Sequence, residues 1–328
     1  MINAPPVSAG GAFLSAGICP PLSPPHLLYF LPMDTTTDIP RYPATRPLAL
    51  AHKPLLDALF AALQPRVSEL TFANLYLFRE AHAYRLSLVE DSTVVLGKGY
   101  GGEEYFLPPL GGDVAGVLRL LLERGMTLYG ADEPFAARYL AGEGVVVEED
   151  RDAFDYLHLR KELAELPGNR FHKKKNRINY FIVRHSFSVA VYGATHREGC
   201  LALLGEWRRV RGGIDSPSLE LETKAAAEAL LLTDRLGLEG VVVLVEGRVA
   251  AFALGERLNR DTAVCHFEKA DPFMEGVSQL VDREFNRLLF ADCTYTNREQ
   301  DLGEPGLRAA KLSYHPVELV KKFRARRA

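Results

Sequence analysis

The sequence predicts a mixed α/β fold built as two successive halves of similar construction. The chain has 328 residues, about twice the length of a typical domain of roughly 150, and 47% of them are hydrophobic. Apolar residues recur with helix spacing in some segments and with strand spacing in others along most of the chain. Each half also contains two short strand patterns joined by a tight polar turn, as in a β-hairpin.

Residues 1–45 are rich in Pro, Ala, Ser and Thr and show no periodicity, so we expect a disordered lead. Translation can begin at Met1 or at Met33. The first domain is expected at 46–165. There, Leu55, Leu56, Leu59 and Phe60 predict one face of a helix. Strands follow at 84–88, 94–96 and 105–107, then a helix after the capping residue Asp113, and a strand at 145–147.

The second domain is expected at 166–328 and repeats this order. Thr195 and Glu198 have the spacing of a capping box that opens a helix, and Gly237 is placed to end the next helix. A hairpin at 241–254 follows, then a strand at 262–268, an amphipathic helix at 277–289, a strand at 293–296 and a short helix. This order is typical of GNAT-type acyltransferases, so the predicted fold class is α/β with mixed sheets, in tandem GNAT-like domains.

Charge and cysteine usage exclude several classes of protein. The formal net charge is −3, so any contact with nucleic acid or an anionic membrane must come from a local patch. None of the four cysteines lies in a CxxC pair, which argues against a zinc site or a disulfide framework. No run of about 18 apolar residues predicts a transmembrane segment. We therefore expect a cytoplasmic protein, with peripheral contact at the inner membrane face, and no metal.

A run of cations at 170–177, RFHKKKNR, opens a predicted helix that continues to about Val183. Positive charge in the first turns of a helix opposes the helix dipole, and a bound anion compensates that cost. A tRNA phosphate, a phospholipid head group and coenzyme A are all suitable anions. The alternatives are a solvated charge run or ion pairs with the acidic stretch 148–155. The candidate binding residues are Lys173, Lys174, Lys175 and Asn176.

The strand at 262–269 carries an unusual set of polar side chains. Period-two alternation predicts Val264, His266 and Glu268 on one face, with Cys265, Phe267 and Lys269 on the other. Charged groups in a central strand require partners, so they either line a cleft or form buried ion pairs with residues such as Arg298 or Asp301.

The third candidate region, 297–314, begins with five polar residues directly after the last predicted strand. Open α/β sheets place their sites at the carboxyl ends of strands. Gly303 and Gly306 permit tight turns near a ligand, and Arg308 and Lys311 share a helix face. The candidate binding residues of this region and of the preceding strand are His266, Asn297, Arg298, Asp301 and Arg308.

Six segments resemble the bacterial family similar to the C-terminal domain of phosphatidylglycerol lysyltransferases. They are FANLY at 72–76, YFLPPLG at 105–111, FHKKKN at 171–176, HFEKA at 266–270, NREQDLG at 297–303 and GLRAAKLSY at 306–314. The resemblance covers the chain from about residue 70 onward and departs from the family pattern at Gln300, where an acidic residue is common. It implies a tandem GNAT fold and kinship with enzymes that move an aminoacyl group from charged tRNA to a lipid or a peptidoglycan precursor.

Aminoacyl transfer requires a base for the acceptor, a group that stabilises the oxyanion and a proton donor for the leaving ribose oxygen. We assign the base to Glu268 or Glu299, charge stabilisation to Lys269 or Lys311, and proton donation to Tyr314. The donor is then aminoacyl-tRNA and the acceptor a lipid head group or a small amine, with no firmly implied cofactor.

Two alternatives stay open: an N-acyltransferase that uses a coenzyme A thioester, and a non-catalytic binding protein that keeps the fold. Against the first, the Q/R-x-x-G-x-G/A turn of acetyl-coenzyme A enzymes is represented here only by Phe273, Gly276 and Ser278. No P-loop, HExxH or dinucleotide motif stands in a suitable context.

Overall fold

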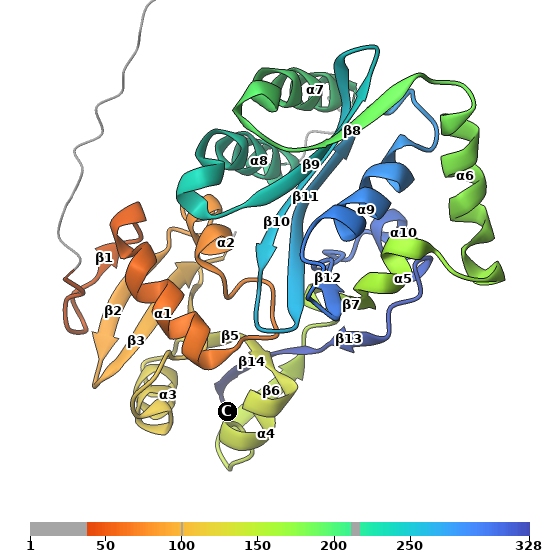
Figure 1. Cartoon of the computed structure of the whole chain (residues 1–328). Helices are drawn as coiled ribbons and strands as arrows, with labels where there is room; N and C mark the ends of the chain where they lie inside the picture. Colours follow the sequence, from red (N-terminus) through yellow and green to blue (C-terminus); the bar gives the residue numbers. More distant parts are fainter. Residues whose placement is uncertain (1–37, 100, 211–216) are drawn as a thin grey trace, which may run out of the picture. The chain divides into compact units, whose positions relative to one another are not determined.

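The computed structural model describes residues 38–99, 101–210 and 217–328. These residues form two seven-stranded mixed sheets (Figure 1). Most of the predicted lead, including Met1 and Met33, lies outside the described residues. The described end of that lead, from Asp38, runs along the first sheet, where Tyr42 N donates to Leu88 O at 3.0 Å.

The first sheet has the strand order β1-β2-β3-β4-β5-β14-β6. Its strands are β1 (Arg46–Pro47), β2 (Arg85–Val89), β3 (Ser92–Lys98), β4 (Glu104–Phe106), β5 (Thr127–Asp132), β6 (Val145–Glu149) and β14 (Lys322–Arg327). The helices of this half are α1 (Lys53–Leu63), α2 (Phe72–Leu77), α3 (Val114–Glu123) and α4 (Glu133–Tyr139).

The second sheet has the order β13-β7-β12-β11-β10-β9-β8. Its strands are β7 (Asp155–Leu159), β8 (Phe187–Val191), β9 (Glu239–Val245), β10 (Arg248–Arg257), β11 (Thr262–Ala270), β12 (Tyr295–Asn297) and β13 (Glu318–Val320). The helices are α5 (Arg160–Glu165), α6 (His172–Ile182), α7 (Arg197–Val210), α8 (Pro217–Leu236), α9 (Val277–Leu288) and α10 (Pro305–Leu312).

The predicted fold class is confirmed, and local sequence explains many of its boundaries. The Asp113 side chain accepts from Gly116 N at 3.0 Å and so caps α3. Glu246 and Gly247 both have positive φ, as a two-residue hairpin turn between β9 and β10 requires. Gly237, with a φ of 77°, follows the last residue of α8 as predicted.

The predicted capping box at Thr195 is wrong by about half a turn. A short 3₁₀ turn covers Ala194–His196, and α7 begins only at Arg197. His196 Nδ1 instead accepts from Gly193 N at 3.1 Å. The His196 ring nitrogen therefore takes the role expected of the Glu198 side chain, which is to accept from the amide three residues earlier.

Two strands cross the predicted division at residue 165. β7, expected within the first domain, lies in the second sheet between β13 and β12. β14, from the end of the chain, lies in the first sheet between β5 and β6. Lys322 of β14 is fully buried and its Nζ donates to Asp155 of β7 at 2.7 Å and to Glu69 at 2.6 Å. This buried ionic contact joins the two halves.

Helices cover both faces of the second sheet (Figure 1). α9 packs against β9, β10 and β11 on one face, while α7 packs against β10 and β11 and also contacts α8 on the other. The amphipathic pattern of α9 explains its position, because its apolar side buries Val277, Leu280, Val281 and Phe285. Strand β11 therefore presents one set of side chains to α9 and another to α7 and α8.

Candidate active site

The site lies where β11 and β12 separate. The two strands pair in parallel only over Thr262–Val264 and Tyr295–Asn297, and β11 then continues to Ala270 without this neighbour. Leu254 of β10 pairs with Phe267, whereas Gly255 pairs with Cys265, so His266 is an extra residue in β11. This β-bulge shifts the alternation of every later side chain in the strand.

The bulge overturns the predicted faces of β11. Glu268 was expected beside His266, but it contacts Ser278 of α9 on the opposite side of the sheet. Lys269 lies on the face opposite Glu268, as alternation predicted, and points to α7 and α8. The alternation failed because strict period-two spacing holds only where the ladder has no extra residue.

On the α9 side, Glu268 belongs to a cluster of charged and phenolic groups. Arg298 Nη2 lies 2.9 Å from Glu268 Oε2 and 3.4 Å from Asp282 Oδ1. The ring of Tyr314 lies 4.5 Å from the Arg298 guanidinium and 3.9 Å from Lys174 Nζ on its ring face. We call Lys174, Glu268, Asp282, Arg298 and Tyr314 the Glu268 cluster.

Burial alters the protonation of this cluster. It raises the pKa of Asp282 to about 7, although the Arg298 charge acts in the opposite direction. It lowers the pKa of Lys174 to about 8, and the Arg298 charge adds to this effect. The pKa of Tyr314 is raised well above its ordinary value, first by burial and then by the Asp282 charge. Two groups thus titrate near neutral pH within one cluster.

The Glu268 cluster also holds unsatisfied buried atoms. Among the described residues, Arg298 Nη1 and Asp282 Oδ2 have no hydrogen-bond partner, although both are out of contact with solvent. An unpaired buried donor or acceptor costs about 1–3 kcal/mol. Arg298 Nη1 can donate to a ligand, and Asp282 Oδ2 can accept from the same ligand. The pair is therefore suited to a polar ligand that carries both kinds of group.

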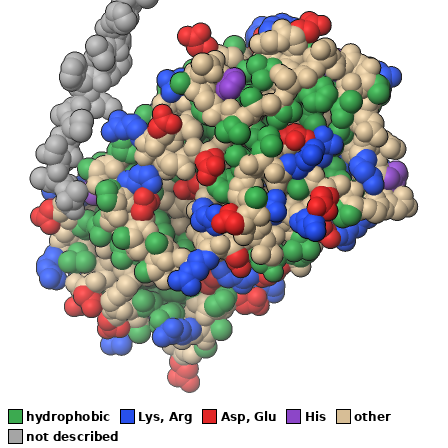
Figure 2. Space-filling model, viewed as in Figure 1, with side chains coloured by type: hydrophobic (Ala, Val, Ile, Leu, Met, Phe, Trp, Pro, Cys, Tyr) green, Lys and Arg blue, Asp and Glu red, His purple; other side chains and the backbone are tan. Residues whose placement is uncertain are grey.

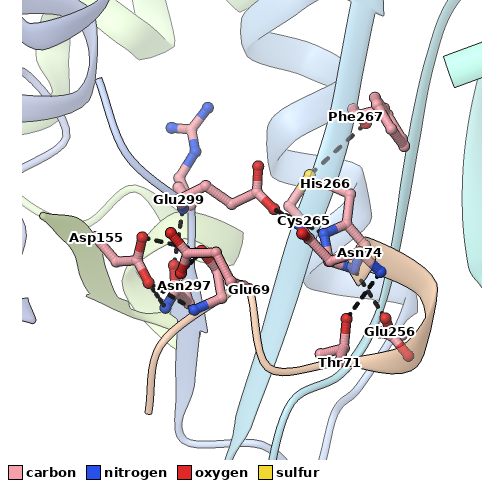
Figure 3. A network of polar contacts seen from close by, with 12 residues as sticks. Glu69, Thr71, Asn74, Asp155, Glu256, Cys265, His266, Phe267, Asn297 and Glu299 are labelled. Carbon is pink, nitrogen blue, oxygen red and sulfur yellow. Dashed lines mark hydrogen bonds and ion pairs between the residues drawn. The ribbon is translucent and has the colours of Figure 1, made fainter. Parts of the chain in front are cut away.

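On the other face, His266 bridges two carboxylates (Figure 3). Its Nδ1 lies 2.7 Å from Glu299 Oε1 and its Nε2 lies 2.9 Å from Glu256 Oε1. Burial opposes a charge on the imidazole, but the hydrogen bonds to Glu256 and Glu299 outweigh it and raise the pKa of His266 to about 10. Asn74 Nδ2, on α2, donates to the same Glu299 oxygen at 3.3 Å. Glu299 is therefore held by a protonated histidine.

Lys269, the other predicted charge-stabilising residue of β11, is not in the Glu268 cluster. It is buried, forms an ion pair with Glu222 of α8 at 2.5 Å and lies 4.0 Å from the centre of the Trp207 ring. The structure thus separates Glu268 and Lys269, neighbours in sequence, by the thickness of the sheet.

Lys311, on α10, lies against the backbone of Arg298 and Glu299, which connects the Glu268 cluster to the His266 network. Its Nζ donates to the backbone carbonyls of Arg298 and Glu299, the latter at 3.1 Å. Burial lowers the pKa of Lys311 to about 8, while the Glu299 charge acts against this. The ammonium group therefore fixes the backbone that positions Arg298 and Glu299 on opposite sides.

The remaining polar residues of 297–308 brace the turn after β12. Asn297 Nδ2 donates to Asp155 Oδ2 at 3.0 Å, and its Oδ1 accepts from Glu299 N at 2.8 Å. Asp301 accepts from Arg308 and Arg151, and these bonds hold its pKa well below the ordinary value despite burial. Asn297, Asp301 and Arg308 thus position the segment that carries Arg298.

The three lysines of the predicted run, Lys173, Lys174 and Lys175, point in different directions from helix α6. Successive residues of a helix point about 100° apart, and here Lys173 faces solvent while Lys174 donates to Ser313 Oγ at 2.7 Å beside Tyr314. Lys175 Nζ donates to Gly168 O at 3.0 Å. Asn176 is exposed. Only Lys174 reaches the Glu268 cluster.

Asp282, Ser278 and Glu256 were not predicted. Asp282 and Glu284 are buried on α9, in a helix whose other buried residues are mostly apolar. An acidic residue within the apolar stripe of an amphipathic helix is a signal that sequence reasoning can use. Among the described residues, no group of three or more His, Cys, Asp or Glu side chains is arranged to hold a metal ion.

Two hollows among the described residues lie away from the Glu268 cluster. One of about 580 Å³ is lined by residues 159–162 and 291–294, at the opposite end of β12 from the cluster. Another of about 220 Å³ lies beside Arg79 and Tyr84 in the first half. No predicted site residue lines either. The Glu268 cluster instead reaches solvent through its own edge, where the Glu268 side chain is 19% exposed.

The fold is that of an acyltransferase-like α/β protein. The chain belongs to the family of phosphatidylglycerol lysyltransferase C-terminal domains, whose model matches residues 60–326. A conserved protein of unknown function from Bacteroides thetaiotaomicron is 30% identical, with a TM-score of 0.80 over 87% of this chain and 99% of that one.

Two more distant relatives also match. The C-terminal domain of a putative lysylphosphatidylglycerol synthetase from Agrobacterium fabrum is 14% identical, with a TM-score of 0.58 over 84% of this chain and 92% of that one. An uncharacterized protein of Mycoplasmoides gallisepticum is 24% identical over 173 residues, which are 52% of this chain and 54% of that protein. The chain thus spans about half the length of that curated relative. In the described part of the chain, no helix has the length and apolar character needed to cross a membrane.

Proposed function

We propose that this protein is an aminoacyltransferase that moves an aminoacyl group from charged tRNA to a phosphatidylglycerol-like lipid or another hydroxyl or amine acceptor. The single observation that carries the proposal is the Glu268 cluster. It combines a carboxylate, a phenol, an arginine with an open donor and an aspartate with an open acceptor, beside the point where two strands separate.

The reaction breaks the ester bond between the aminoacyl carbonyl carbon and the ribose oxygen, and forms a new ester or amide bond to the acceptor. Glu268 accepts the proton of the acceptor hydroxyl or amine. The open Nη1 of Arg298 donates to the tetrahedral oxyanion. Tyr314, whose raised pKa keeps its phenol protonated, returns a proton to the leaving ribose oxygen. Asp282 is the acceptor for the α-ammonium group of the aminoacyl moiety.

Of the predicted candidates, this proposal retains Glu268, Arg298 and Tyr314 as reacting or substrate-contacting groups. Lys174 supplies positive charge beside them for a phosphate or a carboxylate. Lys311, Asn297, Asp301 and Arg308 become positioning residues. Glu299 and His266 hold the opposite face, and Lys269 is assigned to packing against α7 and α8.

A coenzyme A-dependent N-acyltransferase is less well supported. The turn before α9, which would receive the pyrophosphate, is packed against α6: a Cβ added at Gly276 would lie 2.1 Å from the carbonyl oxygen of Arg177. Within this turn the amides of Phe273, Met274 and Val277 already donate to Asp271 Oδ1, Asp271 O and Met274 O, so these three are not open to a pyrophosphate.

The test is transfer of label from a mixed aminoacyl-tRNA pool, by the full chain, to vesicles of phosphatidylglycerol or to soluble amines, with Glu268→Gln as the inactive variant. Comparison of lipids and peptides by mass spectrometry in cells with and without the gene then identifies the acceptor. Transfer equal in wild type and Glu268→Gln would contradict the proposal. A rise in melting temperature with acetyl-coenzyme A, and none with aminoacyl-tRNA, would favour the N-acyltransferase.

A further inference from the structure

The outer side of helix α6 is not used by the proposed reaction. Residues 173, 176, 177, 180, 183 and 184 are all exposed, whereas Ile178 and Phe181 point into the protein core. Their spacing of three and four residues makes them one continuous strip along the helix. Val183 is 76% exposed and Tyr180 is 41% exposed, so the strip presents apolar side chains to solvent among its cations.

One more exposed apolar side chain, that of Phe273, belongs to a turn that packs on this helix. Phe273, in the turn between β11 and α9, is 81% exposed, which is the largest exposure of any large hydrophobic residue in the described part of the chain. The same turn packs on the middle of α6, because Gly276 abuts the backbone of Arg177 and the Cβ of Phe181. We call the α6 strip together with Phe273 the α6 surface.

The charge of the α6 surface differs from that of the whole chain. Residues 170–186 contain six Lys and Arg and no acidic residue, although the complete chain carries a net charge of −3. Within the described residues, no ion pair is formed by Lys173, Arg177 or Arg184. Figure 2 shows basic side chains at the edge of the molecule where Figure 1 places α6. Lys173 and Arg177 are therefore available to an external anion, whereas Arg184 stacks on the Tyr180 ring, 3.5 Å from its centre, and donates to the Tyr180 carbonyl at 3.1 Å.

We propose that the α6 surface docks the protein on a membrane that contains anionic phospholipid. Phe273, Tyr180 and Val183 enter the boundary between head groups and acyl chains, while Lys173, Arg177 and Arg184 lie at the level of the phosphates. The aliphatic Val183 decides between a lipid surface and an RNA surface, since it can bury area in lipid but cannot stack on a base. Docking requires no transfer chemistry, so the inference stands apart from the proposed function.

The experiment is flotation of the full chain with vesicles of phosphatidylcholine, with or without phosphatidylglycerol. We expect binding only to the vesicles that contain phosphatidylglycerol, and weaker binding at high salt. Lys173→Ser with Arg177→Ser should lower the partition coefficient about fivefold for each cation removed. Phe273→Ser should lower it about tenfold, because one exposed aromatic side chain is no longer buried in lipid.

The matched control is Arg119→Ser with Arg138→Ser, which removes two exposed cations from α3 and α4 in the first half. It should bind vesicles as the wild type does, and all variants should keep the wild-type melting temperature. Absence of binding by the wild type, or equal loss in the control, would overturn the proposal. So would loss of tRNA binding on changing Lys173 and Arg177 with vesicle binding retained, because the surface would then recognise RNA.

Discussion

The two faces of strand β11 carry similar charged side chains, but these side chains differ in whether all their buried polar atoms have hydrogen-bond partners. On the α7 and α8 side, His266 and Lys269 each have acidic partners at hydrogen-bond distance. On the α9 side, Arg298 pairs with both Glu268 and Asp282, yet Arg298 and Asp282 each keep one buried atom without a partner. A satisfied buried network stabilises one arrangement, whereas an unsatisfied one leaves groups available to a ligand. The comparison therefore assigns stability to one face and chemistry to the other.

The largest expected effect is on the α9 face. Glu268→Gln should lower the initial rate of aminoacyl transfer by about 10²–10⁴-fold, because the amide cannot accept the acceptor proton. The melting temperature should change little, since Arg298 keeps Asp282 as a partner. Glu275→Gln, which neutralises an exposed carboxyl group on the adjoining turn, is the control. Unfolding of Glu268→Gln with unchanged specific activity would reverse the assignment of this face.

The next effect is on the opposite face. His266→Gln should lower the free energy of unfolding by about 3–5 kcal/mol near neutral pH, because it leaves Glu256 and Glu299 facing each other without a cation. The folded pKa of His266, about 10, exceeds its ordinary value, so the charged histidine stabilises fully below about pH 6.5. That contribution is lost as the pH rises through about 10.

Urea denaturation of the wild type and His266→Gln at several pH values measures this difference. The gap between the two proteins should narrow steadily from about pH 6.5 to about pH 10. If the difference in free energy of unfolding between the two proteins is independent of pH, His266 is neutral in the folded protein. The face that carries His266 would then not be stabilised by a charged histidine.

Lys269→Met gives a smaller effect that separates the faces directly. It should lower the free energy of unfolding by about 1–2 kcal/mol, because it removes a charged hydrogen bond to Glu222, whose side chain is 40% exposed. Specific activity of the folded fraction should be preserved. Thermal unfolding and a transfer assay on the same preparation check both, with Glu222→Gln as the paired control. Loss of transfer without loss of stability would return Lys269 to the catalytic set.

The smallest predicted effect concerns Ser278, whose hydroxyl donates to Glu268 Oε1 at 3.0 Å. Ser278→Ala should lower the transfer rate by about three- to tenfold, since one hydrogen bond that orients the carboxylate is lost. Ser313→Ala, on a hydroxyl that contacts Lys174 instead, is the comparison. A Ser278→Ala enzyme with the full wild-type rate and pH profile would show that Glu268 needs no orientation from α9.

Local signals in the sequence predicted most elements of the fold, including the α3 cap at Asp113 and the hairpin turn at 246–247. The bulge at His266 was not predictable, because an extra residue in one strand becomes visible only against its neighbour. The separation of Glu268 from His266, which alternation placed on one face, follows from that bulge.

Long-range pairing explains the other omissions. The terminal segment KKFRARRA has the composition of a solvated basic tail, but Lys322 is fully buried between Asp155 and Glu69. Those partners lie 167 and 253 residues away, and no periodicity within either segment links them. Asp282 was missed for a related reason, since its partner Arg298 belongs to a different element.

The position of β14 has a consequence for how the protein is made. β6 is held in the first sheet only through β14, which enters between β5 and β6 after the whole second sheet has been synthesised. The first sheet therefore lacks the strand between β5 and β6 until the residues beyond Val320 have been synthesised. Loss of residues 322–327 would therefore detach β6 from the first sheet and remove the Lys322 contact with Asp155 of the second sheet.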